Sequence, residues 1–193
     1  MKLVCGVGVN DADYRVSEYQ IVNGIKRLVW KCPYYRKWQD MLMRCNSDKH
    51  QSKFPSYKGV RVCEEWLTFS NFREWMEKQD WKGKELDKDL IGDGSLYSPG
   101  TCLFITKGIN LFISHNRAHS ELPTGVHYHI GDKCFHSSIR NPFTKKQEFL
   151  GMFSSSEVAH KAWKKRKSEL AIMLANTIED EVISKALISK YEY

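Results

Sequence analysis

The stretch GVHYHIGDKCFHSSIRNPFTKKQEFLGMF, residues 125–153, decides the fold of the C-terminal part of the chain. It holds three short runs of β-favouring residues, separated by residues that favour turns. The runs span residues 125–130, 133–140 and 147–153. The turns are expected at Gly131-Asp132 and at Asn141-Pro142. Because short strands that follow one another usually pair, we predict a three-stranded antiparallel meander.

A helix is predicted directly after the third strand. Ser154-Ser155-Ser156-Glu157 matches a capping box. The apolar residues that would line one face of this helix are Ala159, Trp163, Leu170 and Leu174. One sheet packed on one helix makes a compact domain over 124–175, preceded by a polar linker that contains Pro123. Residues 176–193 form a helical tail in this interpretation.

Residues 1–116 are predicted to form a separate domain with an aromatic core. Apolar residues at helical spacing predict amphipathic helices over 34–45 and 64–78. From Leu86 the pattern changes to a strand, a long loop, a second strand over 101–105 and a short helix over 107–113. The expected fold class of the whole chain is therefore α+β.

The charge of the chain is concentrated in two regions. The net charge is +7, and residues 125–175 alone carry nine basic and four acidic residues. Residues 1–56 carry ten basic and five acidic residues, whereas residues 57–124 are near neutral. Clustered Lys and Arg favour polyanions because each neutralised phosphate releases counterions. A solvated, solubilising surface is the alternative interpretation of the same charges.

The six cysteines are scattered and include no C-x-x-C pair. Structural zinc sites usually take their cysteines from such close pairs, so structural Zn²⁺ is not predicted. Free thiols in a reducing compartment explain the cysteines, and a zinc ion held by the distant Cys45, Cys63 and Cys102 is the open alternative. No apolar run approaches the roughly 20 residues that span a bilayer. We expect a soluble, cytoplasmic protein with no membrane partner.

Asp87-Lys88-Asp89 is the main candidate for metal chemistry in the N-terminal domain. If the segment is a strand, alternation places Asp87 and Asp89 on one face, where paired carboxylates suit Mg²⁺ or Mn²⁺. Asn110 on the following helix offers an amide oxygen as a third ligand. A solvated strand edge is the other interpretation of an exposed D-x-D pattern.

Residues 86–113 resemble the ββα-metal (HNH) nuclease motif, in which a strand with an Asp-His pair leads through a loop to a second strand and a helix. Longer stretches, 6–14, 57–60 with 62–67, and 86–99, look like those of phage-encoded proteins labelled HNH endonuclease. The resemblance implies a metal-dependent DNA endonuclease or nickase of the homing type, a hydrolase. It also implies catalytic roles for Asp87, Lys88 and Asp89.

This sequence has Lys88 where the family has its histidine base. Histidine titrates near neutrality, whereas lysine has an ordinary pKa of about 10.4 and is expected to stay charged between two carboxylates. Two possibilities stay open. Either another group is the base, such as Asp87, Asp89, His115 or His119, or the domain binds DNA without cutting it.

Residues 125–175 are similar to the apetala-two/ethylene-response-factor type of DNA-binding domain. The residues that carry the similarity are Gly125-Val126, Ser138-Ile139-Arg140-Asn141-Pro142, Phe149-Leu150-Gly151-Met152-Phe153 and the helix with Glu157, Ala159 and Trp163. In that family the sheet lies in the major groove of double-stranded DNA and the helix packs behind it. The positions that the resemblance places toward the groove are His127, His129, Ser138, Arg140, Gln147 and Phe149. Lys145 and Lys146 are placed beside phosphates.

The sequence therefore predicts a phage-type DNA-binding protein with an HNH-like domain and an apetala-two-like domain. If a phage encodes it, the protein acts in the host cytoplasm. A catalytically inactive DNA-binding regulator is the first alternative, and an inhibitor of a host protein is the second, although no sequence feature points to a protein partner. The basic helix over 161–167 is expected to present a solvated face, with one or two residues able to contact phosphate.

Overall fold

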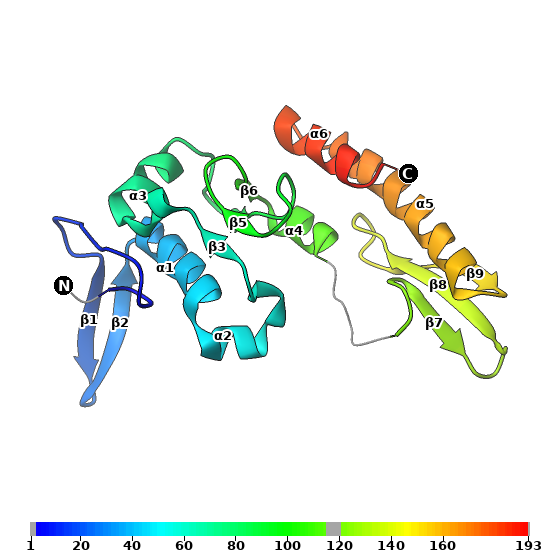
Figure 1. Ribbon diagram of the computed structural model, residues 1–193, viewed down its shortest axis with the longest axis horizontal. Helices are drawn as coiled ribbons and strands as arrows, with labels where there is room; N and C mark the ends of the chain where they lie inside the picture. The colour runs from blue at the N-terminus through cyan, green and yellow to red at the C-terminus, as the bar shows by residue number, and fades with distance from the viewer. Residues whose placement is uncertain (1–2, 115–120, 193) are drawn as a thin grey trace. The chain divides into compact units, whose positions relative to one another are not determined.

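The computed structural model describes residues 3–114 and 121–192 (Figure 1). The chain divides into two compact units, Met1–Ile105 and Thr106–Tyr193. Each unit combines helices with small sheets, which confirms the α+β class. The helix after Ile105 belongs to the second unit, whereas the sequence-based boundary at residue 116 groups it with the first. Among the described residues, no helix has the length and apolar character that crossing a bilayer requires.

The first unit is built on helices α1 (Pro33–Asn46) and α3 (Phe69–Glu77). Trp38 of α1 is fully buried, and its indole Nε1 donates a hydrogen bond to the carbonyl oxygen of Trp66 at 2.7 Å. The neighbouring aromatic rings lie around it, including Phe69, whose ring centroid is 5.4 Å away. The prediction of an aromatic core for this part of the chain is confirmed.

The single helix predicted over 64–78 is broken in the structure. A 3₁₀ turn, η2 (Glu64–Leu67), is followed by Thr68 in an extended conformation, and α3 begins only after it. Val9 causes the break, because its backbone accepts a hydrogen bond from Phe69 at 3.0 Å and donates one to Leu67 at 2.8 Å. A pairing with a segment so distant in sequence leaves no signal in helical periodicity.

The first unit also contains an exposed hairpin that the sequence-based prediction lacked. Strands β1 (Ser17–Val22) and β2 (Ile25–Lys31) pair antiparallel around an Asn23-Gly24 turn. Both turn residues have positive φ angles, as a two-residue hairpin loop with the Asn-Gly sequence requires. Helix α2 (Asp48–Lys53) and the 3₁₀ turn η1 (Pro55–Tyr57) follow α1.

Four short strands complete the first unit. Strand β3 (Arg61–Val62) pairs parallel with β5 (Leu96–Tyr97), and β4 (Glu85–Asp87) pairs antiparallel with β6 (Leu103–Ile105). The strand expected over 86–90 therefore ends at Asp87.

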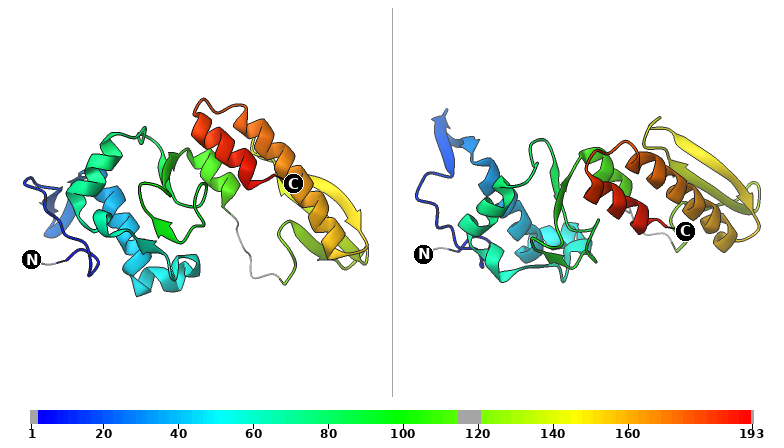
Figure 2. Two further views of the ribbon diagram at one scale, coloured as in Figure 1. Left: turned by 45° about the horizontal axis from the view of Figure 1, so that its top comes forward. Right: turned by 90° about the horizontal axis from the view of Figure 1, so that it is seen from above.

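The second unit contains the three-stranded meander in the predicted order. Strands β7 (Val126–His129), β8 (Cys134–Arg140) and β9 (Gln147–Phe153) are antiparallel neighbours. Helix α5 (Ser156–Ala175) packs along one face of this sheet, as Figures 1 and 2 show. Gly125 permits this close packing, because a Cβ added there would lie 1.9 Å from Cδ1 of Trp163.

The start of α5 differs from the predicted capping box. Ser155 is the N-cap, and its hydroxyl accepts a hydrogen bond from the backbone N–H of Val158 at 3.4 Å. Because the helix begins one residue later than the motif requires, Glu157 is not the residue three positions after the cap.

Two further helices pack with α5 in the second unit. Helix α4 (Lys107–Ile113) lies where the sequence predicts it, and the tail forms α6 (Glu181–Lys190). Ser184 of α6 donates a hydrogen bond to the carbonyl oxygen of Ala175 at 3.1 Å. The buried side chains of Ile183 and Leu187 complete the contact with α5.

Candidate functional site

Asp87 lies at the end of β4 and is buried. Its Oδ1 atom accepts backbone hydrogen bonds from Asp89 at 3.1 Å and from Leu90 at 2.8 Å, so the side chain stabilises a turn. Burial raises the pKa of this carboxyl group. The expected alternation of Asp87 and Asp89 along one strand is wrong, because the chain turns directly after Asp87.

Lys88 is buried beneath two tyrosine rings. Its Nζ lies 5.6 Å from the ring centroid of Tyr57 and 5.7 Å from that of Tyr97. The same Nζ donates to Oδ1 of Asp89 at 2.8 Å. Gly94 passes close to this ion pair, since a Cβ there would lie 2.4 Å from Oδ1 of Asp89. The side chain of Asp89 is 54% exposed, so the pair is open to solvent on one side.

The other predicted participants in metal chemistry are Asn110 and the candidate bases His115 and His119. Asn110 is on α4 in the second unit, and its backbone carbonyl oxygen accepts a hydrogen bond from the Ser114 hydroxyl at 2.6 Å. The candidate bases His115 and His119 lie outside the described residues. A joint Mg²⁺ or Mn²⁺ site of Asp87, Asp89 and Asn110 stays a prediction.

The sheet face opposite α5 carries the six residues that the resemblance places toward the groove. Ser137 and Ile139 of β8 are buried under the helix. Because side chains alternate along a strand, their neighbours in β8 and the partners of those neighbours occupy the other face. The residues on this face from the predicted set are His127, His129, Ser138, Arg140, Gln147 and Phe149. We call it the outer sheet face.

The outer sheet face exposes both polar and aromatic groups. Gln147 donates from its amide nitrogen to the hydroxyl of Ser138 at 2.8 Å, which links β9 to β8. Arg140 is exposed at the end of β8, directly opposite Gln147. Phe149 is 60% exposed, although aromatic side chains of this size are usually more deeply buried.

Lys145 and Lys146 extend from the turn that joins β8 to β9, as predicted from the sequence. Both are exposed, and Lys145 has a φ of 60° and donates from Nζ to the carbonyl oxygen of Pro142. Asn141 holds this turn, because its Oδ1 accepts backbone hydrogen bonds from Phe143 at 2.7 Å and from Thr144 at 3.1 Å.

Three residues of the outer sheet face, Cys134, His136 and Met152, are missing from the sequence-based set. His136 and Met152 pair with each other across β8 and β9, and Met152 is 61% exposed. The ring of His136 lies between those of His127 and Phe149, with centroid distances of 5.3 Å to each. The register of the three strands was needed to find them, since the resemblance marks only Ser138 and Arg140 in β8.

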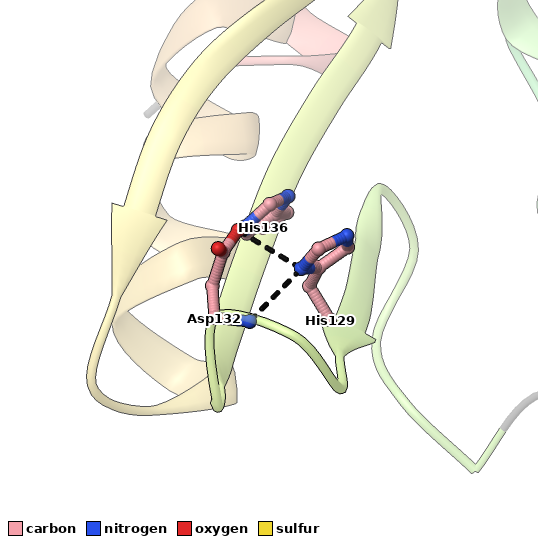
Figure 3. A group of neighbouring side chains, drawn as sticks. All are labelled: His129, Asp132 and His136. Atoms are coloured by element: carbon pink, nitrogen blue, oxygen red, sulfur yellow. Dashed lines mark hydrogen bonds and ion pairs between the residues drawn. The ribbon is translucent and has the colours of Figure 1, made fainter.

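A cluster of metal-ligating residue types lies beside the turn that joins β7 to β8 (Figure 3). It consists of His129 at the end of β7, Asp132 in the turn and His136 in β8. Oδ2 of Asp132 lies 2.9 Å from Nδ1 of His129 and 2.8 Å from Nε2 of His136. The sequence signal is the spacing H-x-x-D-x-x-x-H across a predicted two-residue turn, which returns the second histidine to the first.

The basic residues of α5 divide into three groups. Lys161, Lys164 and Lys165 are exposed, as expected. Arg166 binds Glu148 of β9 through two nitrogen atoms, at 2.8 and 3.2 Å, and so fixes the helix to the sheet. Lys167 is buried, which contradicts the expectation of a solvated face at this position.

Burial lowers the pKa of Lys167 to about 8. Its Nζ lies 3.4 Å from the ring centroid of Phe112 and donates a hydrogen bond to the carbonyl oxygen of Phe112 in the last turn of α4. The ring centroid of Tyr191 is 4.8 Å from the same Nζ. Lys167 therefore joins α4 and the C-terminal segment to α5.

Comparisons with protein-family models, with curated proteins and with solved structures find no match for this chain.

Proposed function

We propose that this protein binds double-stranded DNA through the outer sheet face. The observation that carries the proposal is the position of Arg140, Gln147 and Phe149 on one exposed face, with Lys145 and Lys146 in the adjoining turn. Helix α5 covers the opposite face of the sheet. The exposed face is therefore available to a large ligand, while the helix supports it from behind.

The chemistry of these side chains suits a base-reading surface. The guanidinium of Arg140 can donate two hydrogen bonds to O6 and N7 of guanine, and the amide of Gln147 can pair with adenine. Phe149 offers an apolar contact for the methyl group of thymine. Lys145 and Lys146 suit phosphate oxygens, which position a protein without reading the sequence. The major groove is about 12 Å wide and admits a β-ribbon.

DNA cleavage by the turn at Asp87 is the second candidate, and one observation favours it. Both backbone hydrogen bonds to this carboxylate end on Oδ1, and within the described residues Oδ2 accepts none. Oδ2 could therefore bind Mg²⁺ or Mn²⁺. Against this, the ammonium group of Lys88 lies 2.8 Å from Asp89, the second expected ligand, and would repel a cation there. The geometry supports DNA binding better than DNA cleavage.

Binding is tested by selecting duplexes from a random-sequence pool with the full chain and measuring affinity for them in gel-shift assays. We expect tight binding that weakens as salt rises, with a log–log slope of about −0.9 for each phosphate contacted. Failure to bind any duplex at low salt would refute the proposal.

Cleavage is tested on supercoiled DNA in Mg²⁺ or Mn²⁺, with the wild type beside Asp87→Asn. Asparagine keeps an Oδ1 atom for the two backbone hydrogen bonds but removes the charge that binds a cation. Nicking by the wild type that is lost in Asp87→Asn would support the nuclease. Equal nicking by both proteins would exclude Asp87 as the metal ligand.

A further inference from the structure

We propose that the hairpin of β7 and β8 carries a binding site for a divalent transition metal such as Zn²⁺, with His129, Asp132 and His136 as its protein ligands. The site differs from the predicted Mg²⁺ or Mn²⁺ site at Asp87, and it does not depend on DNA binding.

The first argument is the convergence of three donor atoms. Nδ1 of His129, a carboxylate oxygen of Asp132 and Nε2 of His136 all lie within 4.8 Å of one another. Asp132 lies to one side of the stacked histidine rings, with Oδ2 less than 3 Å from the nitrogen of each (Figure 3). The hairpin register fixes this arrangement, since His129 ends one strand and His136 lies shortly after the start of the next.

The second argument is that Nε2 of His136 is buried and lacks a hydrogen bond to any residue that the structure describes. This nitrogen is buried and makes no hydrogen bond within the described residues, although Oδ2 of Asp132 lies 2.8 Å away. The contact has the distance of a hydrogen bond without its direction. A buried polar atom without a partner is destabilising, and a metal ion would give this nitrogen one.

Neighbouring rings fix the side chain of His136, whereas the side chain of His129 has room to move. The ring of His136 is packed between His127 and Phe149. The ring of His129 stacks on that of His136 at 4.6 Å but is 49% exposed, so it has room to rotate. Metal binding requires that rotation, because nitrogen lone pairs of two parallel rings cannot both point at one ion. It also replaces the hydrogen bond that Nδ1 of His129 accepts from the backbone N–H of Asp132 at 3.1 Å.

The donor set indicates the class of metal. Two imidazole nitrogens and one carboxylate oxygen suit Zn²⁺, Co²⁺ and Ni²⁺, whereas Mg²⁺ and Ca²⁺ prefer oxygen ligands alone. Asp132 is partly exposed, so water can complete the coordination of the ion. A bound ion would add positive charge to the outer sheet face and hold the two strands together beside the turn that joins them.

The test is titration of the full chain, first stripped of metal with a chelator, with Zn²⁺ and Co²⁺ near neutral pH. Calorimetry measures affinity and stoichiometry, and the Co²⁺ absorption spectrum reports whether thiolates are ligands. The variants are His136→Gln and Asp132→Asn, with His160→Gln on α5 as a matched histidine control outside the cluster. Circular dichroism of the metal-free proteins checks that each variant is folded.

We expect one equivalent of metal to bind the wild type and His160→Gln, and affinity to fall at least about tenfold in both cluster variants. The Co²⁺ spectrum should lack a thiolate charge-transfer band, and Mg²⁺ should not compete. Binding that persists in the cluster variants, a thiolate band from the cysteines, or no binding by the wild type would each overturn the proposal.

Discussion

Lys167 gives a prediction of stability that depends on pH. Burial lowers its pKa from 10.5 in the unfolded chain to about 8 in the folded protein. Below about pH 8 the ammonium group is protonated in both states, and the folded state bears the full cost of burying it. Between pH 8 and 10.5 the folded state loses the proton while the unfolded state keeps it, so the free energy of unfolding rises with pH.

The magnitude follows from the size of the shift. A difference of one pKa unit corresponds to about 1.4 kcal/mol, so the whole shift corresponds to about 3 kcal/mol. Between about pH 7 and about pH 9.5 the wild type should gain about 2 kcal/mol from this residue. Lys167→Met removes the titrating group but also leaves the carbonyl oxygen of Phe112 without this donor, a loss that does not depend on pH.

The assay is urea denaturation of the wild type and Lys167→Met, followed by circular dichroism at each pH. The thiols of Cys45 and Cys102, whose pKa values are raised by burial to about 11 and about 12, titrate in both proteins and cancel in the difference. The free energy of unfolding of the wild type should rise relative to that of the variant as pH increases. A difference that is constant or falls with pH would refute the proposed burial of a charged lysine.

Two further predictions concern the framework of the sheet domain. Gly125→Ala should destabilise the second unit by about 2–5 kcal/mol, from the positive φ of 81° and the collision with Trp163. Gly59→Ala in the first unit is the control, because Gly59 has a φ of 80° and a Cβ there would have nothing within 4 Å. It should lower the free energy of unfolding only by the backbone strain, about 1–2 kcal/mol. Hydrogen exchange of peptides from each unit measures the two losses of stability. Ser155→Ala should cost about 1 kcal/mol in chemical denaturation, because the N–H of Val158 loses its acceptor, and no change would show that this cap is unimportant.

The sheet and its helix could be predicted from sequence because their signals are local. Turn residues such as Asn141 and Gly131 separate the strands, and a serine cap opens α5. Two errors in the first unit come from specific hydrogen bonds. The break at Thr68 depends on backbone hydrogen bonds to Val9, and the end of β4 depends on the carboxylate of Asp87, which accepts a hydrogen bond from the backbone N–H of Asp89. Periodicity does not record either interaction.

The residues of the candidate sites also divide into those that could be placed from the sequence and those that only the strand register or the packing places. The resemblance to the apetala-two type of domain, and not alternation, predicted Arg140 and Phe149 on a common face, and the register of β8 and β9 is consistent with it. The meeting of His129 with His136 depends on the register across the turn, which the sequence specifies only weakly. Lys167 was assigned to the solvent because it lies in a basic run, and only the packing of α4 and the C-terminal segment against α5 buries it.

The most direct test of the central proposal is fluorescence anisotropy of a selected, labelled duplex with the wild type, Arg140→Ala and Lys185→Ala. Lys185 lies on α6, away from the outer sheet face, and is ion-paired with Glu181 at 2.7 Å. Lys185→Ala removes one positive charge, as Arg140→Ala does, and so controls for the change in net charge. We predict that Arg140→Ala weakens binding by about 5- to 150-fold, which corresponds to about 1–3 kcal/mol, while Lys185→Ala binds like the wild type. Equal affinities for all three proteins would contradict DNA recognition by this face.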